Sequence, residues 1–271
     1  QHEGPRMSHR LTILGCGSSG GVPRIGAMWG QCDPENPKNR RRRCAVLIER
    51  FGNGGVTRVL VDTPPDIREQ LLDVRVAAID AVVFTHDHAD HTHGIDDLRM
   101  VAYAMKRRID SYFDAPTRRS LEERFGYCFS TPKGSGYAPI MVAKDIAAGS
   151  SITVDGAGGA ITLQAIPQVH GDIASLGLRV GNLAYSPDVS ELPREAVAML
   201  QGLDHWIVDA LRYTSHPSHF SVKEALGWID KLGVKHGVLT HMTTDLDYAA
   251  LRRELPAHVE PAYDGMQIAF E

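Results

Sequence analysis

The amino-acid sequence predicts an α/β (α+β) fold in which two β-sheets pack face to face and helices cover their outer surfaces. Short strand-like runs rich in Val, Ile and Leu recur along the chain, and helical stretches lie between some of them. The strands come in groups rather than in strict alternation with helices. Because strict alternation indicates a single parallel sheet, the grouped order favours two packed sheets.

Local residue patterns predict the position of each strand and helix. Apolar and β-branched runs predict strands at 11–15, 44–49, 58–62, 80–85, 160–166, 176–180, 182–186, 205–210 and 236–240. Helical spacing of apolar residues predicts helices at 66–73, 94–107, 117–125, 193–201, 221–232 and 246–254. Ser221 and Glu224, three residues apart, form the capping-box pattern that marks the start of the helix at 221–232.

Composition and organisation are those of an ordinary globular protein. No repeat or linker interrupts the chain, which predicts one domain over residues 7–271; residues 1–6, QHEGPR, resemble a cloning remnant before a native start at Met7. The net charge of −4 disfavours nucleic acid as a partner. With no apolar run long enough for a membrane span, no export signal and four dispersed cysteines typical of reduced thiols, we expect a cytoplasmic protein.

Side chains of the metal-ligand type follow several of the predicted strands. These residues are Asp62, His86, His170, Asp188 and His241. Loops at strand ends, held by a rigid scaffold, are where binding and catalytic residues usually lie. The repeated coincidence predicts a functional site at one edge of the sheets.

The segment 86–91 is the strongest motif of the chain. It reads H-x-H-x-D-H directly after a strand, and divalent ions such as zinc bind imidazole nitrogens and carboxylate oxygens. Residues two apart in an extended turn point to the same side, so His86 and His88 can bind one ion. A helix that begins near Asp90 would direct Asp90 and His91 to a second ion.

Four side chains do not complete two metal sites, because each site needs further ligands and an open position for water. His170, Asp188 and His241 are the candidates for the remaining positions. Asp188 is the natural bridge, since a carboxylate has two oxygens that neutralise two cations together. The ligand types predict two divalent ions, zinc or manganese, with iron less favoured.

This arrangement resembles the metallo-β-lactamase fold superfamily. The resemblance implies a four-layer αββα sandwich with a dinuclear metal site at one edge of the two sheets, and a homodimer is common among such proteins. All seven ligand positions are filled, which argues against a metal-free relative. The assignment that the resemblance implies is His86, His88 and His170 for the first ion, Asp90, His91 and His241 for the second, Asp188 between them, and Asp62 behind the site.

The substrate must be inferred from other segments, because one fold hosts many reactions. The predicted helix at 221–232 offers free N–H groups and a positive dipole end to an anion. His219 lies two residues before its cap and is placed to bind a phosphate oxygen or protonate a leaving alkoxide. The alternative is a histidine that only stabilises the loop, and His216 is a weaker second candidate. We count His219, Asp188 and Asp90 as the catalytic residues.

A histidine before a helix resembles the phosphodiesterase branch of the superfamily. Within it, "LGCGSSGGVP" (14–23), "GIDDLR" (94–99) and "YDGMQIAF" (263–270) are similar to the phosphoribosyl 1,2-cyclic phosphodiesterases of the carbon–phosphorus lyase pathway. The resemblance implies hydrolysis of a small cyclic phosphodiester, a sugar phosphate or nucleotide, by a metal-activated hydroxide.

The sequence departs from that subgroup at one place. Its members can hold a structural zinc on a C-x-C-x-x-C set after Trp-Gly, together with a histidine three residues beyond the last catalytic ligand. Here "QCDPEN" follows Trp29-Gly30, and Thr244 stands three residues after His241. Because Cys32 alone cannot form such a site, we predict that this zinc is absent.

Two further segments have open interpretations. Gly15, Gly17, Gly20 and Gly21 do not have the phosphate-loop spacing, and we expect them to let the backbone pass close to the metal edge. The run "KNRRRR" (38–43) is by default a solvated loop. The alternative is that one or two of Arg40 to Arg43 contact substrate phosphate, since arginine binds phosphate with two parallel hydrogen bonds.

Rival functions remain within the same superfamily. A tRNA 3′-processing endonuclease uses a similar metal set, but the long arm that usually holds tRNA is not evident in the sequence. A β-lactamase is disfavoured because no export signal is present. A pyrroloquinoline-quinone-biosynthesis-like oxidative protein shares a similar glycine-rich start, and a non-catalytic binding role is the least favoured.

Overall fold

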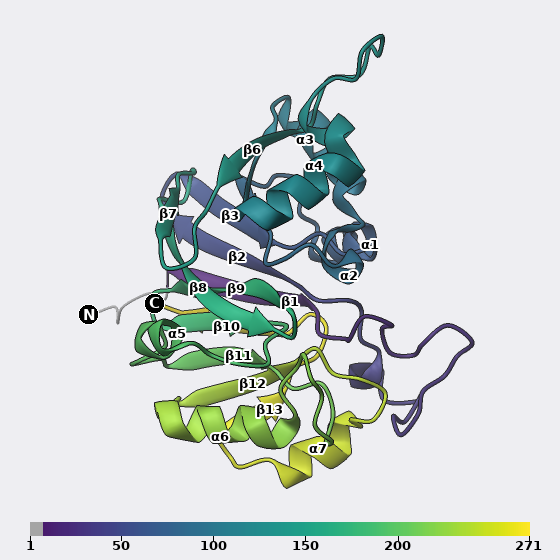
Figure 1. The fold of residues 1–271 in the computed structure, drawn as a ribbon, viewed down its shortest axis with the longest axis vertical. Helices are drawn as coiled ribbons and strands as arrows, with labels where there is room; N and C mark the ends of the chain where they lie inside the picture. The colour runs from purple at the N-terminus through teal and green to yellow at the C-terminus, as the bar shows by residue number, and fades with distance from the viewer. Residues whose placement is uncertain (1–7) are drawn as a thin grey trace.

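The computed structural model describes residues 8–271, so the predicted start at Met7 and the residues before it lie outside the described part (Figure 1). Two seven-stranded sheets are formed within these residues. The first sheet consists, in spatial order, of β14 (Gln267–Phe270), β1 (His9–Gly15), β2 (Ala45–Gly52), β3 (Gly55–Val61), β4 (Ala81–Val83), β5 (Ile109–Phe113) and β6 (Met141–Asp145). The second consists of β13 (Val259–Pro261), β12 (His236–Thr240), β11 (His205–Asp209), β10 (Leu183–Ser186), β9 (Ile173–Val180), β8 (Ile161–His170) and β7 (Ser151–Val154).

Helices flank the two sheets on their outer faces (Figure 1). The helices beside the first sheet are α1 (Ile67–Val74), α2 (Ala89–Thr92), α3 (Arg99–Met105) and α4 (Ala115–Phe129), with the 3-10 turn η2 (Ile95–Leu98) before α3. Those beside the second are α5 (Arg194–Met199), α6 (Val222–Leu232) and α7 (Tyr248–Glu254), and a second 3-10 turn, η1 (Pro37–Asn39), precedes β2. None of the helices in the described part is long and apolar enough to cross a membrane.

Alternating side chains of the first sheet build two separate cores. Val46 and Ile48 of β2 face the second sheet, whereas Leu47, between them, faces the helices. The same alternation places Leu60 of β3 in the helix-facing core and its neighbours Val59 and Val61 in the core between the sheets. Because both faces of these strands are buried over residues 45–48 and 59–61, these stretches are apolar at every position rather than at every second one. The predicted αββα sandwich is therefore confirmed.

The nine predicted strands and six predicted helical regions all correspond to observed elements, with some differences. The predicted helix at 94–107 is divided into the 3-10 turn η2 and helix α3. Sequence reasoning missed β5, β6, β7, β13 and β14. These strands are only three to five residues long in the structure, so little pattern distinguishes them from loops.

The predicted capping box is present at the start of α6. The Ser221 hydroxyl accepts a hydrogen bond from the Glu224 amide at 3.2 Å, and the Glu224 carboxylate accepts one from the Ser221 amide at 2.7 Å. Two otherwise unpaired donors of the helix end are thereby satisfied. Because the helix begins two residues after His219, the cap also fixes the end of the segment that carries this histidine.

Replacing Ser221 with alanine should lower the free energy of unfolding by about 1 kcal/mol, because one amide of the first turn loses its acceptor. Chemical denaturation of the metal-loaded protein measures this value. The matched control is Ser215→Ala, an exposed serine in the neighbouring loop, for which no comparable loss is expected. Equal stability of the two variants would show that the cap contributes nothing.

Candidate metal centre

The six-residue motif follows the short central strand β4. His88 adopts an extended conformation at the position before α2, and α2 begins at Ala89, as the sequence predicted for a helix near Asp90. The turn of the chain between His88 and Asp90 thus separates two pairs of side chains. His86 and His88 come from the extended part, whereas Asp90 and His91 come from the helix.

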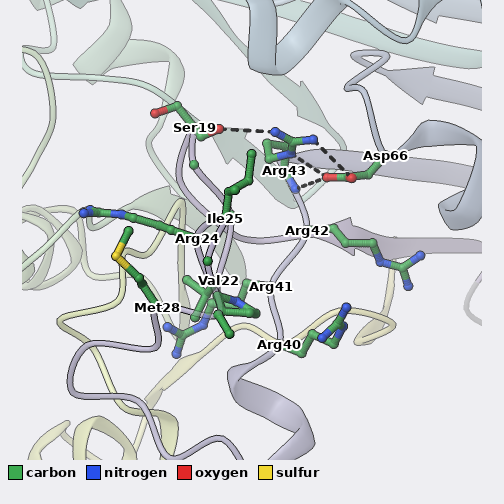
Figure 2. Close-up of a pocket in the computed structure, with 15 residues that line it drawn as sticks. Ser19, Val22, Arg24, Ile25, Met28, Arg40, Arg41, Arg42, Arg43 and Asp66 are labelled. Atoms are coloured by element: carbon green, nitrogen blue, oxygen red, sulfur yellow. Dashed lines mark hydrogen bonds and ion pairs between the residues drawn. The ribbon is translucent and has the colours of Figure 1, made fainter.

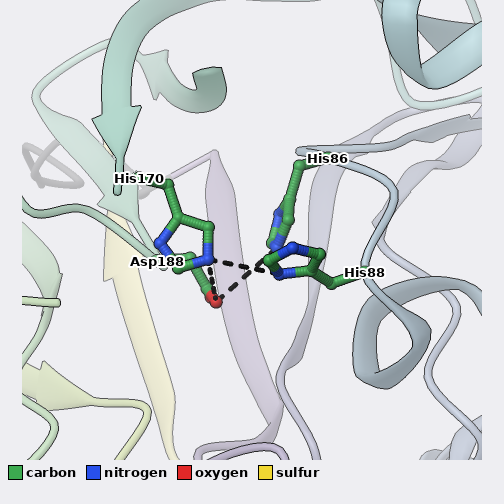
Figure 3. Close-up of side chains that lie close together, drawn as sticks. All are labelled: His86, His88, His170 and Asp188. Atoms are coloured by element: carbon green, nitrogen blue, oxygen red, sulfur yellow. Dashed lines mark hydrogen bonds and ion pairs between the residues drawn. The ribbon is translucent and has the colours of Figure 1, made fainter. Parts of the chain in front are cut away.

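His86 and His88 lie close to two residues contributed by the second sheet, His170 and Asp188 (Figure 3). His170 is the last residue of β8, and Asp188 follows β10. One ligand atom from each of His86, His88, His170 and Asp188 lies within 4.8 Å of the others. The Nε2 atom of His170 is 3.4 Å from Asp188 Oδ2 and 3.2 Å from His88 Nδ1, and His86 Nε2 is 3.6 Å from the same Asp188 oxygen.

The second pair forms an equivalent group with His241, which follows β12. Ligand atoms of Asp90, His91, Asp188 and His241 again lie within 4.8 Å of one another. His91 Nε2 is 2.9 Å from Asp188 Oδ1, and His241 Nε2 is 3.3 Å from Asp188 Oδ2. Asp188 is therefore common to both groups, and the two sheets contribute side chains to each.

Hydrogen bonds behind the groups determine which ring nitrogen faces the centre. A carboxylate or carbonyl oxygen only accepts, so His91 donates from Nδ1 to Asp62 at 2.7 Å, and His170 donates from Nδ1 to the Ser218 carbonyl at 2.6 Å. Asp62 also accepts from the amide and the hydroxyl of Thr85, at 2.8 and 2.7 Å. These contacts leave Nε2 of both histidines free for a metal ion.

Several buried polar atoms of the centre lack any hydrogen-bond partner within residues 8–271. They are Nε2 of His86 and His91, both ring nitrogens of His241, and Oδ1 of Asp188. Leaving such groups unpaired costs free energy, so their convergence fits a site for a cation. Burial lowers the pKa of His86 well below its usual value and that of His170 to about 4, which favours the neutral rings that bind metals. The donor set fits divalent ions.

The backbone is strained at three residues of the centre. Asp62, Asp188 and His241 have φ values of 67°, 38° and 58°. These values lie in the left-handed region, which residues other than glycine rarely adopt. Asp62 and His241 lie directly after β3 and β12, and Asp188 lies two residues after the end of β10. Strain of this kind is typical of functional sites.

His219 lies beside both groups. Its ring is 4.6 Å from that of His241 and 4.7 Å from that of His170, measured between centroids. Its Nδ1 donates to Asp209 Oδ2 at 2.6 Å, which leaves Nε2 as the atom available to a ligand. Asp209 ends β11 and was missed by sequence reasoning, although it is one more acidic residue at a strand end.

A model of the β-lactamase superfamily domain matches residues 57–242, more than half of the chain. The chain belongs to the β-lactamase superfamily. A crystal structure described as a new diphosphatase from the PhnP family is 34% identical, has a TM-score of 0.84, and matches over 97% of this chain and 98% of that one. These findings confirm the predicted resemblance to the superfamily and its phosphodiesterase branch.

Other relatives are more distant. Zinc-bound PqqB from Methylobacterium extorquens has a TM-score of 0.74 at 16% identity, over 96% of this chain and 99% of that one, which shows the fold alone. The octanoyltransferase of Porphyromonas gingivalis (strain ATCC BAA-308 / W83) is 30% identical over 263 residues, or 95% of this chain and 51% of that protein. The chain thus spans about half the length of this curated relative.

Membership of the β-lactamase superfamily implies divalent metal ions, and the paired His/Asp groups provide a place for them. Membership of the superfamily, the His/Asp groups and the likeness to the diphosphatase together indicate a metal-dependent hydrolase. The glycine-rich turn packs closely against the backbone of residues 41–43. A Cβ at Gly15 would come within 2.0 Å of the Arg43 carbonyl, and one at Gly17 within 2.7 Å of the Arg41 carbonyl.

A buried arginine, Arg41, lies beside Cys32. Arg41 is 1% exposed and donates to the Thr243 carbonyl at 3.1 Å, and Cys32 Sγ donates to the Thr244 carbonyl at 3.5 Å. Both hydrogen bonds hold residues 243–244, the segment that follows His241, in place. The default interpretation of the arginine run as a solvated loop is therefore wrong for Arg41.

Replacing Asp62 with asparagine should weaken metal binding by about 10- to 100-fold, because His91 loses the carboxylate that orients its ring. Metal content after dialysis against a graded chelator measures the change without any assay of activity. Asp97→Asn, a change at an exposed acidic residue of η2, is the matched control. Unchanged metal retention in the Asp62 variant would remove Asp62 from the support of the centre.

Proposed function

We propose that the chain hydrolyses a small cyclic phosphodiester, of the phosphoribosyl cyclic phosphate or nucleotide type. The observation that carries the proposal is the position of His219, backed by Asp209 and adjacent to both His/Asp groups. Support also comes from the 34% identity to a diphosphatase of the PhnP family. Both point to chemistry at a phosphorus–oxygen bond.

In this proposal the seven clustered side chains are the ligands of two divalent ions, zinc or manganese. His86, His88 and His170 would hold the first ion, Asp90, His91 and His241 would hold the second, and Asp188 would be shared by both. When bound, such ions supply an activated water and neutralise the charge of a phosphate group. The membership of Asp188 in both four-residue groups supports this assignment rather than a single-ion site.

His219 serves the leaving group. Asp209 holds its Nδ1 proton, so the ring presents Nε2 to the substrate and gains a negative charge behind it when it is protonated. A proton delivered from Nε2 would neutralise the alkoxide released from the phosphodiester. Asp209 is thus a positioning residue for His219, in the way that a carboxylate orients a histidine in other hydrolases.

His219→Ala should lower turnover of a substrate with an alkoxide leaving group by about 100-fold or more, the usual contribution of a general acid. Turnover of bis(p-nitrophenyl) phosphate should fall much less, because p-nitrophenolate leaves without protonation. The exposed residue His258 provides the matched control, His258→Ala. Equal losses on both substrates, with metal content intact, would contradict a proton-donating role.

The reaction class is tested by turnover of the manganese- or zinc-loaded protein on three substrates. Ribose 1,2-cyclic phosphate 5-phosphate should be hydrolysed in preference to a 2′,3′-cyclic nucleotide and a tRNA precursor. Preference for the precursor would support the tRNA-processing alternative instead. Inactivity on all three with two ions bound would overturn the phosphodiesterase proposal and favour the oxidative alternative.

The remaining proposals concern the setting of the enzyme. We propose that residues from Met7 onward form one catalytic domain, since both sheets contribute side chains to the same centre. The four cysteines are buried and unpaired, which supports a reducing, cytoplasmic environment. A homodimer remains a proposal based on the superfamily.

A further inference from the structure

The histidines of the first His/Asp group differ in what orients their rings. His86 Nδ1 is hydrogen-bonded to the Thr85 hydroxyl at 3.0 Å, and His170 Nδ1 to the Ser218 carbonyl at 2.6 Å. His88 is exposed, and in the described part of the chain the one hydrogen bond of its ring joins Nδ1 to Nε2 of His170. Because both of these nitrogens are candidate ligand atoms, that contact is no support from behind the ring. The position of His88 therefore depends on its backbone.

Arg124 of α4 contacts the chain on both sides of this ligand candidate. Its Nη2 donates to the Asp87 carbonyl at 2.6 Å and lies 3.5 Å from the Asp87 carboxylate. Its Nη1 donates to His93 Nε2 at 2.8 Å. Asp87 and His93 flank residues 88–91, which include three ligand candidates of the motif. One guanidinium group thus joins the two ends of the segment that carries them.

The Arg124 side chain is itself held in place. Ser120, one helical turn earlier, accepts from Nη2 through its hydroxyl at 2.9 Å and from Nε through its carbonyl at 3.4 Å. The next residue, Phe125, interrupts the regular helix with φ −130° and ψ 34°, and its ring packs edge-on against His93 at a centroid distance of 5.4 Å. Because these contacts order the guanidinium group, it can serve as a fixed support.

Two arginines of the run at 40–43 hold different segments. Arg43 bonds to Asp66, before α1, at 2.6 Å and to the Ser19 carbonyl at 3.5 Å (Figure 2). Arg41 holds the segment after His241, as described above. In the described part of the chain, Arg124 is thus the arginine whose side chain bonds to residues 87–93.

We propose that Arg124 is a positioning residue for the first His/Asp group. By holding Asp87 and His93, it sets the backbone that directs His88 toward the ion. This role rests on the proposed function, because it takes His88 as a ligand of the first ion, but it does not depend on the substrate. Lysine replaces only part of the role, since a single ammonium group lacks the planar fork that reaches two acceptors.

The test measures how tightly each ion is held, from the metal content after dialysis against a graded chelator. Arg124→Gln should release one ion at a chelator concentration lower by about tenfold or more, the usual effect of removing an outer support of a metal ligand. The second ion should be retained as in the unmodified protein. Arg124→Lys should give a smaller loss. His88→Ala, which removes the ligand candidate itself, identifies the release step of the first group.

Arg118→Gln is the matched control, for which both ions should be retained. Arg118 lies on the same helix, its side chain is 34% exposed against 32% for Arg124, and it pairs with Glu122 and Asp145 rather than with the motif. Chemical denaturation of the metal-free proteins should give the same midpoint for the Arg124→Gln and Arg118→Gln variants. A clearly lower midpoint for Arg124→Gln would assign Arg124 to fold stability instead.

Equal weakening of both ions in Arg124→Gln, or unchanged retention of both, would overturn the positioning role. An unmodified protein that holds a single ion would refute the two-ion part of the proposed function. The affinity of that ion would still decide the role of Arg124: a loss of about tenfold or more in Arg124→Gln supports it, and no loss contradicts it.

Discussion

The carboxylate of Asp188 is the contact on which the rest of the centre depends. Its two oxygens lie between imidazole groups that come from both sheets, at distances of 2.9 to 3.6 Å from four histidines. Such a concentration of buried donors without hydrogen-bond partners is unfavourable unless a cation occupies the space. The requirement for metal thus accounts for the convergence of side chains from both sheets at this edge.

The same requirement explains why the supporting residues lie where they do. Asp62 orients His91 and simultaneously accepts two hydrogen bonds from Thr85, so the strand before the motif is joined to the helix after it. Asp209 plays the corresponding part for His219 on the second sheet. Each sheet therefore carries one buried aspartate that fixes a histidine ring. Rotation of either ring would misdirect the nitrogen that faces the centre.

The fold class and the cluster could be predicted from sequence because their signals are local. The H-x-H-x-D-H string and the ligand-type residues after apolar runs need no knowledge of distant contacts. Asp209 carries the same strand-end signal but was overlooked, because "HWIVDA" was interpreted as strand throughout. The burial of Arg41 could not be predicted, since it depends on contacts such as the one with the Thr243 carbonyl, about 200 residues away in the chain. The short strands β5, β6 and β7 likewise depend on pairing with neighbours rather than on their own pattern.

The central claim is that Asp188 bridges two metal ions held by residues of both sheets. Anomalous diffraction from crystals of the zinc- or manganese-loaded protein, measured on both sides of the metal absorption edge, tests it most directly. We predict two anomalous peaks about 3.5–4 Å apart, one on each side of the Asp188 carboxylate. A single peak, or two peaks without contact to Asp188, would contradict the account.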